Sequence, residues 1–378
     1  MINRQTGIVT EVICVSDVLS EIKVLINGLE AKAYAFPQQT GEIKKGDCVI
    51  LNTTAVDLGL GSGGYHFVMS CNGHKTSSDV RNQNSSFNIK RQDGHIMKLR
   101  YTPFQLRVCA VEESENLNHD TMDGTTDIKD IPVICGSLHS ALIPCVCGVK
   151  AINSNLRIAY VMTDGGALPL ALSKATRILK EHKLIAGTVT VGHAYGGDCE
   201  AINLYSGLLA AVGVLRAQVI IVLMGPGVVG TATKWGNTAI EVGQIINATA
   251  ALNGRSYTIA RLSFADRRNR HYGLSHHTRT ALEDVALSPT QLVLPKLERW
   301  KKQTVQNQLN AMILKKHRVI WGDGYWGIKI AEEAGFELNY MGRKYVDDPA
   351  YFLAASAAGE VAASTVVITS SKQNDDTQ

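Results

Sequence analysis

Short runs of alternating apolar and polar residues fill most of the first 110 positions of the chain. An alternation with a period of two places every second side chain on the same face, which is typical of strands with one buried face. Turn residues such as Asn27-Gly28 separate the runs at short intervals. The pattern predicts a small all-β barrel or sandwich domain over residues 1–110. The runs are GIVTEVICV, SEIKVLING, AKAYAF, DCVILNTT, YHFVMS and IMKLRYTPFQLRV.

Two polar stretches interrupt this pattern. Residues 74–94 are nearly free of aliphatic side chains, which predicts a long exposed loop. Residues 111–131 contain seven acidic residues and one lysine. Because like charges at that density repel one another, we predict a solvated acidic linker there.

From residue 132 onward, continuous apolar runs alternate with stretches of helical periodicity. Apolar strands separated by helices are typical of a parallel sheet that is covered on both faces. We therefore predict a doubly wound, Rossmann-like α/β domain with a mostly parallel sheet over 132–369, followed by a disordered tail at 370–378. The expected strands are IPVICG, LRIAYVMT, GTVTVGH, AQVIIVLM, SYTIARLSF, QLVLP, HRVIWG and FELNYM. The expected helices include LPLALSKATRILKEH, DCEAINLYSGLLAAVG, NTAIEVGQIINATAAL and KLERWKKQTVQNQLNAMILKK.

The composition narrows the class of protein. The chain has 378 residues, of which 45% are hydrophobic, so it is long and apolar enough for two buried cores. A net charge of +4 does not require nucleic acid or an acidic membrane as a partner. The N-terminus lacks a signal-peptide pattern, and the most apolar stretch, 207–224, is interrupted by Arg216 and Gln218. Eight cysteines without a C-x-x-C pair indicate reduced, mostly buried thiols. We expect a cytoplasmic protein that makes no membrane contact.

Polar residues gather where the predicted strands end. In a doubly wound sheet, ligands bind in the crevice beyond the carboxyl ends of the strands. Five consecutive strand ends carry glycine, carboxylate, histidine or hydroxyl groups, which predicts a site along this edge. The five segments are SLHS, TDGGALP, GHAYGGDCE, GPGVVGTATKWGNT and ADRRNRHYGLSHH.

The side chains in these segments suggest acid–base or metal chemistry. Carboxylates at buried strand ends suit a base or a metal ligand, and imidazoles transfer protons. The catalytic candidates are Asp164, His271, His276 and Asp266. The further candidates for the wall of the site are His139, Thr163, His193 and Asp198, together with Asn52, Thr53 and His66 from the N-terminal region. Asp198 also fits the N-cap of a helix.

A glycine-rich segment is the candidate for binding an anion. Gly225, Gly227 and Gly230 match G-x-G-x-x-G after a strand, with Thr231 and Thr233 close behind. Several residues separate the last glycine from the next helical pattern, and no acidic residue ends the following strand, so phosphate or another oxyanion fits better than a dinucleotide. A tight turn without a ligand is an equal alternative. The fork-shaped guanidinium of Arg267 would hold the same anion.

A divalent metal is the candidate cofactor, and its identity is open. Carboxylates and histidines that could furnish the site follow several strands, but the spacings H-x-H and H-E-x-x-H are absent. The residues are Asp164, His193, Asp266, His271, His276 and His277. Because adjacent side chains point in different directions, at most one of His276 and His277 is expected to face the site.

Six stretches of the sequence, taken as a set, resemble one known family. They are LNTTAVDLGLGSGGYHFV, KLRYTPFQ, MTDGGALPLALS, GHAYGGDCEAIN, GPGVVGTAT and SFADRRNRHYGLSHHT. Together they resemble the uncharacterised bacterial family known as domain of unknown function 3866. The resemblance implies that the two regions act as one functional unit, and it carries no established reaction. The family has glutamine at the position of His193 and glycine at that of Ala232, which weighs against an essential acid–base role for His193.

We therefore expect an enzyme, a hydrolase or transferase, that acts on a phosphorylated or carboxylated small molecule in the crevice. The N-terminal loop 52–66 would close over it. The alternative is a metabolite-sensing or scaffold protein that uses the same crevice for binding only. A nucleic-acid partner protein fits less well, because the basic residues of 296–318 lie at helix ends without interleaved aromatic residues. The sequence is also compatible with a homo-oligomer.

Overall fold

The structure, a computed structural model, describes residues 3–366 except for positions 17, 58, 60–63, 73–93, 101–103, 105 and 315. It divides into two compact units, Met1–Val108 and Cys109–Gln378. The exposed loop predicted at 74–94 lies outside the described residues apart from Gly94, and so does the tail predicted at 370–378.

The first unit contains a closed barrel of five described strands, as the alternating pattern predicts. Strand β1 pairs antiparallel with β2 and β4, whereas β3 pairs in parallel with β5, so the order around the barrel is β1-β2-β3-β5-β4. This connectivity is that of the OB-fold. Ile22, Val24, Val49 and Leu51 are completely buried in its interior. The elements of this unit are β1 Arg4–Val15, β2 Ser20–Ile26, β3 Leu29–Ala35, α1 Pro37–Thr40, β4 Cys48–Asn52, α2 Thr54–Asp57, β5 Tyr65–Asn72, β6 Ile96–Lys98 and β7 Leu106–Val108.

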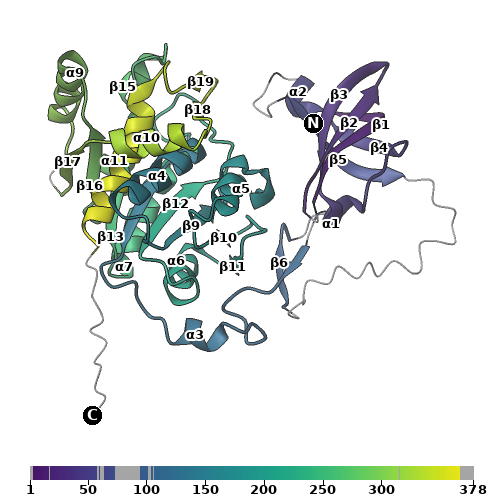
Figure 1. Ribbon diagram of the computed structural model, residues 1–378, viewed down its shortest axis with the longest axis horizontal. Coiled ribbons are helices and arrows are strands. Elements are labelled where there is room, and N and C mark those ends of the chain that lie inside the picture. The colour runs from purple at the N-terminus through teal and green to yellow at the C-terminus, as the bar shows by residue number, and fades with distance from the viewer. Residues whose placement is uncertain are drawn as a thin grey trace. The chain divides into compact units, whose positions relative to one another are not determined.

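The second unit is built around one parallel sheet of eight described strands (Figure 1). The order is β11-β10-β9-β12-β8-β13-β16-β17, and neighbouring strands all run parallel. Strands β8, β9, β10 and β12 are buried along their whole length, which is why they appear in the sequence as continuous apolar runs. The strands are β8 Pro132–Gly136, β9 Ile158–Thr163, β10 Gly187–Val191, β11 Cys199–Ala201, β12 Val219–Met224, β13 Arg255–Ile259, β16 Gln291–Pro295 and β17 Arg318–Gly322.

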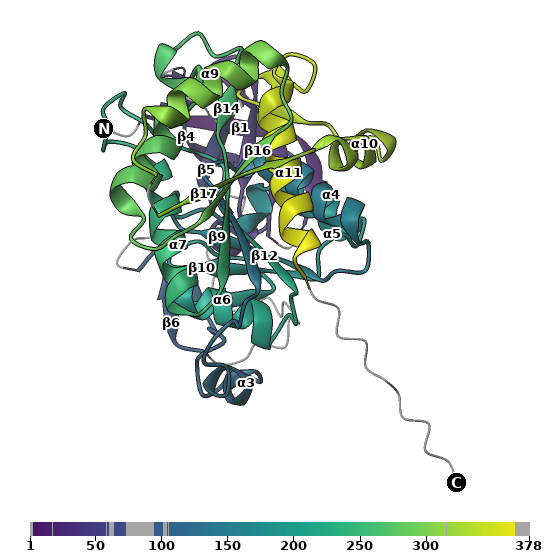
Figure 2. The ribbon, with the colours of Figure 1, turned by 90° about the vertical axis from the view of Figure 1, so that its left-hand side faces the viewer.

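Helices cover both faces of this sheet, so the unit is a Rossmann-like, doubly wound α/β fold. Helices α4, α5, α10 and α11 contribute to the core on one face, and α6, α7 and α9 to the core on the other. Figure 2 shows α4, α5, α10 and α11 on the opposite side of the strands from α6 and α7. The helices are α3 His119–Asp123, α4 Leu142–Ile152, α5 Lys174–Glu181, α6 Leu204–Gly213, α7 Glu241–Ala251, α8 His276–Thr280, α9 Arg299–Asn310, α10 Tyr325–Glu333 and α11 Pro349–Ser364.

The winding of the sheet reverses around β8. The connections from β8 to β9 and on to β10 pass through α4 and α5 on one face. Those from β10 to β12 and on to β13 return through α6 and α7 on the other face. β12 and β13 are the two neighbours of β8 in the sheet. The chain leaves β8 toward one face of the sheet, whereas it leaves the neighbouring β12 toward the other face. Such a divergence opens a crevice at the carboxyl ends of the strands.

Two details of the predicted sheet are wrong. The segment from Asp198 was expected to open a helix, but residues 199–201 form the edge strand β11 and α6 begins only at Leu204. The side chain of Asn203 caps α6, because its Oδ1 accepts the backbone N–H groups of Tyr205 and Ser206. The predicted strand FELNYM yields only β18 (Asn339–Tyr340), which pairs with β19 (Arg343–Lys344) outside the main sheet.

The acidic stretch 111–131 packs on the second unit, whereas its charge predicts a solvated linker. Val111, Met122 and Ile128 are buried in the same core as α6 and α7. Glu112 accepts the backbone N–H of the residue after β11 through its Oε1, at 2.9 Å. Glu113 accepts the backbone N–H of Ala110 at 2.6 Å. The apolar residues interspersed among the acids therefore anchor the segment.

Helices α4, α10 and α11 pack against one another at glycines. A Cβ at Gly148 would overlap the backbone oxygen of Ser356, and one at Gly359 would overlap the backbone oxygen of Cys145. Gly327 of α10 approaches the backbone of Gly148 in the same way. The missing side chains therefore allow the three helix backbones to come close together.

We expect Gly148→Ala to lower the free energy of unfolding by about 1–3 kcal/mol, because the added methyl group must displace helix α11. Chemical denaturation measures this. The matched control is Gly124→Ala, where φ is −78° and an added Cβ would meet its nearest neighbour at 3.4 Å. The control should change the free energy by about 0.5 kcal/mol or less. Equal losses in the two variants would contradict the role of close helix packing.

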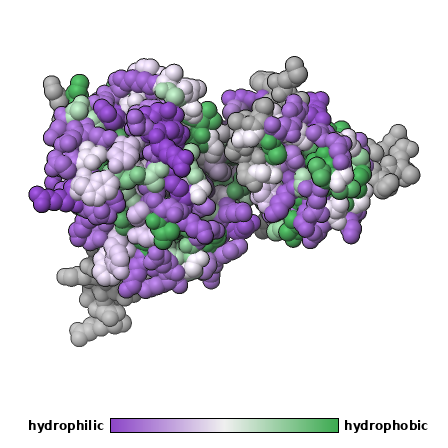
Figure 3. Space-filling model, turned by 90° about the horizontal axis from the view of Figure 1, so that it is seen from above, coloured by the Kyte–Doolittle hydropathy of each residue, from purple (hydrophilic) through white to green (hydrophobic). Residues whose placement is uncertain are grey.

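None of the described helices has the length and apolar character needed to cross a membrane. Figure 3 shows that hydrophilic residues cover most of the visible face of the second unit, with apolar residues in small separate patches. The eight cysteines are free thiols, as predicted, and four of them are buried.

Candidate functional site

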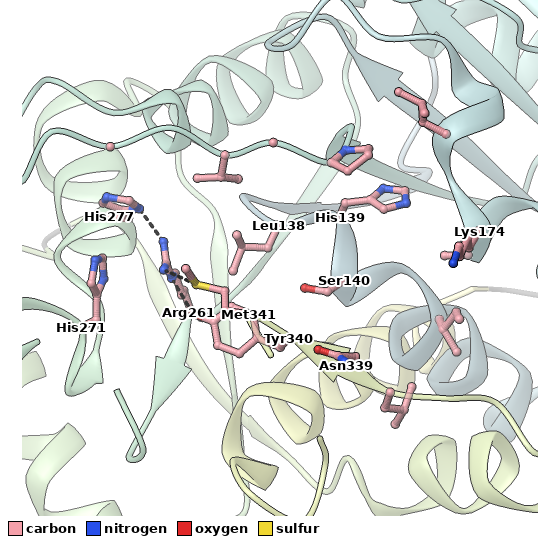
Figure 4. A pocket seen from close by; sticks show the side chains of 18 of the residues that line it. Leu138, His139, Ser140, Lys174, Arg261, His271, His277, Asn339, Tyr340 and Met341 are labelled. Carbon is pink, nitrogen blue, oxygen red and sulfur yellow. Dashed lines mark hydrogen bonds between the residues drawn. The ribbon is translucent and has the colours of Figure 1, made fainter. Parts of the chain in front are cut away.

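A cavity of about 740 Å³ lies at the carboxyl ends of β8, β9, β12 and β13 (Figure 4). The segments that follow these four strands line it, together with residues 337–341 around β18. This is the point where the winding of the sheet reverses, so the crevice predicted from polar strand ends is present. A volume of this size suits a small-molecule ligand.

Arg261 is the most deeply buried charge of the cavity, with 4% of its surface exposed. It follows β13 directly, and neutral groups receive its hydrogen bonds. Its Nε donates to the hydroxyl of Tyr340 at 3.2 Å, and its Nη1 donates to Nδ1 of His277 at 2.7 Å. Its Nη2 contacts Sδ of Met341 at 3.7 Å. In the described part of the chain, no carboxylate forms an ion pair with Arg261.

The buried carboxylates of this region form hydrogen bonds or ion pairs with two other arginines. Asp266 accepts hydrogen bonds from Nε and Nη2 of Arg268 at 2.9 and 2.7 Å. Asp348, which is 1% exposed, accepts from the Ser263 hydroxyl and forms an ion pair with Arg343 at 3.3 Å. The hydrogen bonds from Arg268 lower the pKa of Asp266. Asp266 therefore orients Arg268, which lines the cavity, and does not itself line it.

Three histidines, His271, His276 and His277, lie together beside Arg261. Their ring centroids are between 4.4 and 5.0 Å apart. Because a guanidinium only donates, Nδ1 of His277 must accept and its proton must be on Nε2. That Nε2 faces the glycine-rich loop, since a Cβ at Gly230 would lie 3.5 Å from it. His271 and His277 line the cavity, so of the adjacent pair it is His277 that faces it.

The imidazoles of this cavity are neutral near pH 7. Burial, followed by the charge of Arg261, lowers the pKa of His271 to about 3 and that of His277 to about 3. Burial, followed by the charge of Arg270, also lowers the pKa of His276. Burial lowers the pKa of His139 to about 4.

The three histidines do not fit a divalent cation, although one ligand atom from each lies within 4.8 Å of the others. A metal ligand needs a free nitrogen lone pair. The Nδ1 lone pair of His277 accepts from Arg261, and its Nε2 then carries the proton, so neither nitrogen offers a lone pair to an ion. The charges of Arg261, Arg268 and Arg270 lie close enough to lower the pKa of His276, and they would repel a cation equally.

The other proposed metal ligands and wall residues lie outside the described lining of the cavity, except for His139. Oδ2 of Asp164 accepts the backbone N–H of His193 at 3.1 Å. The Thr163 hydroxyl donates to Oε2 of Glu241 at 2.7 Å. Asp198 pairs with Lys180 of α5 and accepts from Thr188, so it fixes the loop that leads to β11.

Asn52, Thr53 and His66 belong to the first unit, and their described contacts lie within that unit. Oδ1 of Asn52 accepts the backbone N–H of Thr54, and the Thr53 hydroxyl donates to Asp57 at 2.7 Å. Burial lowers the pKa of His66. Most of the tip of loop 52–66 lies outside the described residues, so its predicted closure over the crevice stays a prediction.

The glycine-rich loop borders the cavity, but no helix begins directly after it. Gly227 and Gly230 line the cavity, whereas Gly225 is buried beneath them. The hydroxyls of Thr231 and Thr233 lie 3.0 Å apart and are exposed. A turn and a bridge between Gly230 and Asn237 separate the glycines from α7, which begins at residue 241. The loop therefore offers backbone groups to the cavity without the positive end of a helix.

Arg267, the predicted anion clamp, is exposed and lies outside the described lining, whereas Arg268 and Arg270 are part of it. Sequence reasoning also missed Arg261 and Glu241. Arg261 ends the run SYTIAR at the predicted edge of the sheet, which was a usable signal. Burial raises the pKa of Glu241 to about 7, and no local pattern indicates that burial.

The sequence model of the family described as "Protein of unknown function (DUF3866)" matches residues 32–359. The chain belongs to the DUF3866 family. The matched range includes β4, β5 and the end of β3 from the barrel, and nearly the whole of the second unit with its cavity. No curated protein and no solved structure matched the chain.

In this DUF3866 chain, low histidine pKa values couple stability to pH. Between about pH 6.5 and pH 3 the unfolded chain binds protons at His271 and His277 that the folded chain does not bind, so stability must fall as the pH falls. We expect His277→Gln, which still offers Arg261 an acceptor, to reduce the loss of unfolding free energy between about pH 7 and pH 5 by about 2 kcal/mol.

The measurement is chemical denaturation across this pH range. His182→Gln, at an exposed position after α5, is the control and should keep the wild-type pH dependence. A wild-type slope in His277→Gln would mean that this imidazole is not held neutral by its surroundings.

Proposed function

We propose that the second unit binds a small phosphorylated or carboxylated molecule in the cavity and acts on it as a hydrolase or transferase. The observation that carries this proposal is Arg261, a nearly buried guanidinium without a carboxylate partner among the described residues. A guanidinium stays charged at every accessible pH, and a buried charge without a counter-charge is costly. An anionic ligand in the cavity would supply that counter-charge.

The charge balance of the lining supports the same class of ligand. Arg268, Arg270 and Lys174 add positive charges around the cavity. Among its described lining residues only Glu337 is acidic, and it is exposed. Guanidinium groups bind phosphate and carboxylate through charge-assisted hydrogen bonds. Asp266 already accepts from Nε and Nη2 of Arg268, so Arg261, whose hydrogen bonds go to neutral groups, is the guanidinium better suited to an oxyanion. Gly227 and Gly230 bring the backbone of the glycine-rich loop to the cavity, where Gly230 lies beside His277.

The neighbouring histidines would supply a hydrogen bond to the anion and a proton for a leaving group. Nε2–H of His277 faces Gly230, where it would donate a hydrogen bond to the anion. Burial and, after it, the charges of Arg261 and Arg268 lower the pKa of His271. A bound anion offsets these arginine charges, so ligand binding raises that pKa. His271 would then hold a proton for a leaving group only while the ligand is bound.

A binding-only role as a metabolite sensor is the second candidate. It is favoured by the pKa values of about 3 for His271 and His277, which are far below those of groups that transfer protons near pH 7. A panel of phosphate monoesters, acyl phosphates and carboxylates, assayed for product and for thermal stabilisation, separates the two roles. Product formation supports the enzyme, and stabilisation without product supports the sensor. If the panel gives neither product nor thermal stabilisation, an anionic small-molecule ligand is refuted.

The Arg261→Met variant tests the anion site directly. We expect it to lose at least about tenfold in affinity for inorganic phosphate or phenyl phosphate, because a buried charge-assisted contact is removed. Its free energy of unfolding without ligand should stay equal or rise, because an uncompensated buried charge is also removed. Isothermal titration calorimetry and chemical denaturation measure the two effects.

Arg255→Met is the matched control, at the opposite end of β13. Arg255 donates to the backbone oxygens of Asp130 and Thr365, at 2.7 and 3.1 Å. Its loss should lower stability and leave anion affinity unchanged. Unchanged affinity in Arg261→Met, or no binding of either phosphate by the wild-type protein, would contradict the proposal.

A further inference from the structure

Nearly all the cationic groups of the cavity come from one segment of the chain. The segment 261–277 supplies three arginines to the lining, together with two neutral histidines, and Figure 4 shows His271, His277 and Arg261 close together on one side. Lys174 lies well away from them in the same view and is exposed. The cavity therefore has one charged wall.

His139 does not extend this charge to the other side. Its Nδ1 is 3.2 Å from the Tyr160 hydroxyl, and its Nε2 is 2.7 Å from the Ser173 hydroxyl. Both ring nitrogens are therefore engaged within the protein, and the ring is neutral near pH 7. It cannot act as a further cationic donor to a ligand in the cavity.

The rest of the wall is mainly apolar. Leu138, Ile143 and Leu338 line the cavity with 6 to 7% of their surface exposed. Ile178 of α5 and Val228 of the glycine-rich loop line it and are only half-buried. These side chains come from elements on several sides of the crevice, and they leave apolar surface facing an interior space.

We infer that the ligand is amphipathic, with one anionic group at Arg261 and an apolar alkyl or aryl body against Leu138, Ile143 and Ile178. The inference rests on the proposed anionic ligand and names its class: phosphate monoesters or carboxylic acids with an apolar substituent. A free inorganic anion would leave most of the cavity of about 740 Å³ and its apolar wall without a partner. Covering such surface is a principal source of binding free energy for small ligands.

A homologous series of ligands tests this class. The probes are inorganic, methyl, propyl and pentyl phosphate, titrated calorimetrically below the concentration at which they aggregate. We expect affinity to rise by up to about fourfold for each methylene that the cavity buries. The neutral alcohols of the same length should bind at least tenfold more weakly, about the value of one charge-assisted contact. Equal affinity along the phosphate series would overturn the inference.

Ile178→Ala and Ile330→Ala make a matched pair of variants. Both isoleucines are half-buried and pack against the same core, but only Ile178 lines the cavity. Ile178→Ala should flatten the dependence on chain length without weakening the binding of inorganic phosphate, whereas Ile330→Ala should keep the wild-type dependence. The same slope in both variants would count against the apolar wall.

The outcomes separate this inference from the proposed function. If none of the phosphates binds, the proposed anion site itself is wrong. If inorganic phosphate binds and the series is flat, only the apolar body is wrong. Sedimentation with phosphatidic acid vesicles distinguishes a lipid headgroup from a soluble ester. Binding to vesicles without binding of pentyl phosphate would overturn a ligand enclosed in the cavity.

Discussion

The burial of the Arg261 charge is the constraint on which the candidate site depends. A guanidinium removed from water needs partners for its hydrogen bonds, and here a phenol, an imidazole and a thioether receive them. None of these groups carries a negative charge. The geometry of the strand end holds the arginine in place, and no carboxylate of the described residues compensates its charge. The proposed anionic ligand would do so.

The carboxylates near Arg261 do not compensate its charge, because they bind other groups. Asp266 and Asp348 carry negative charge within the same region, yet hydrogen bonds commit them to Arg268, to Ser263 and to Arg343. Tyr340, which accepts from Arg261, stacks on Tyr351 of α11 at 3.9 Å between ring centroids. Helix α11 is in turn held close to α4 by glycine contacts. The packing of one face of the sheet therefore positions the cationic wall of the cavity.

Most of the architecture could be predicted from local pattern. The alternation in 1–110 predicted the barrel, and seven of the eight predicted strands of the second region are found in its sheet. The eighth, FELNYM, lies outside the main sheet, because its residues 339–340 pair with β19 and residues 337–341 line the cavity. Helix α11 has apolar residues on nearly every side, so it lacks the one-sided periodicity by which a surface helix is recognised.

The sequence by itself determined the order of strands and helices, the edge of the sheet where polar groups gather, and the cation-rich segment after β13. These follow from hydrophobic periodicity and from the rule for parallel sheets, both of which act over short distances along the chain. Only the tertiary structure decided that Arg261 and Arg268, and not Arg267, face the cavity, and that His277 turns inward. It also decided that the three histidines are neutral groups beside arginines. Those outcomes depend on burial and on charges contributed by residues far apart in the sequence, which no local pattern encodes.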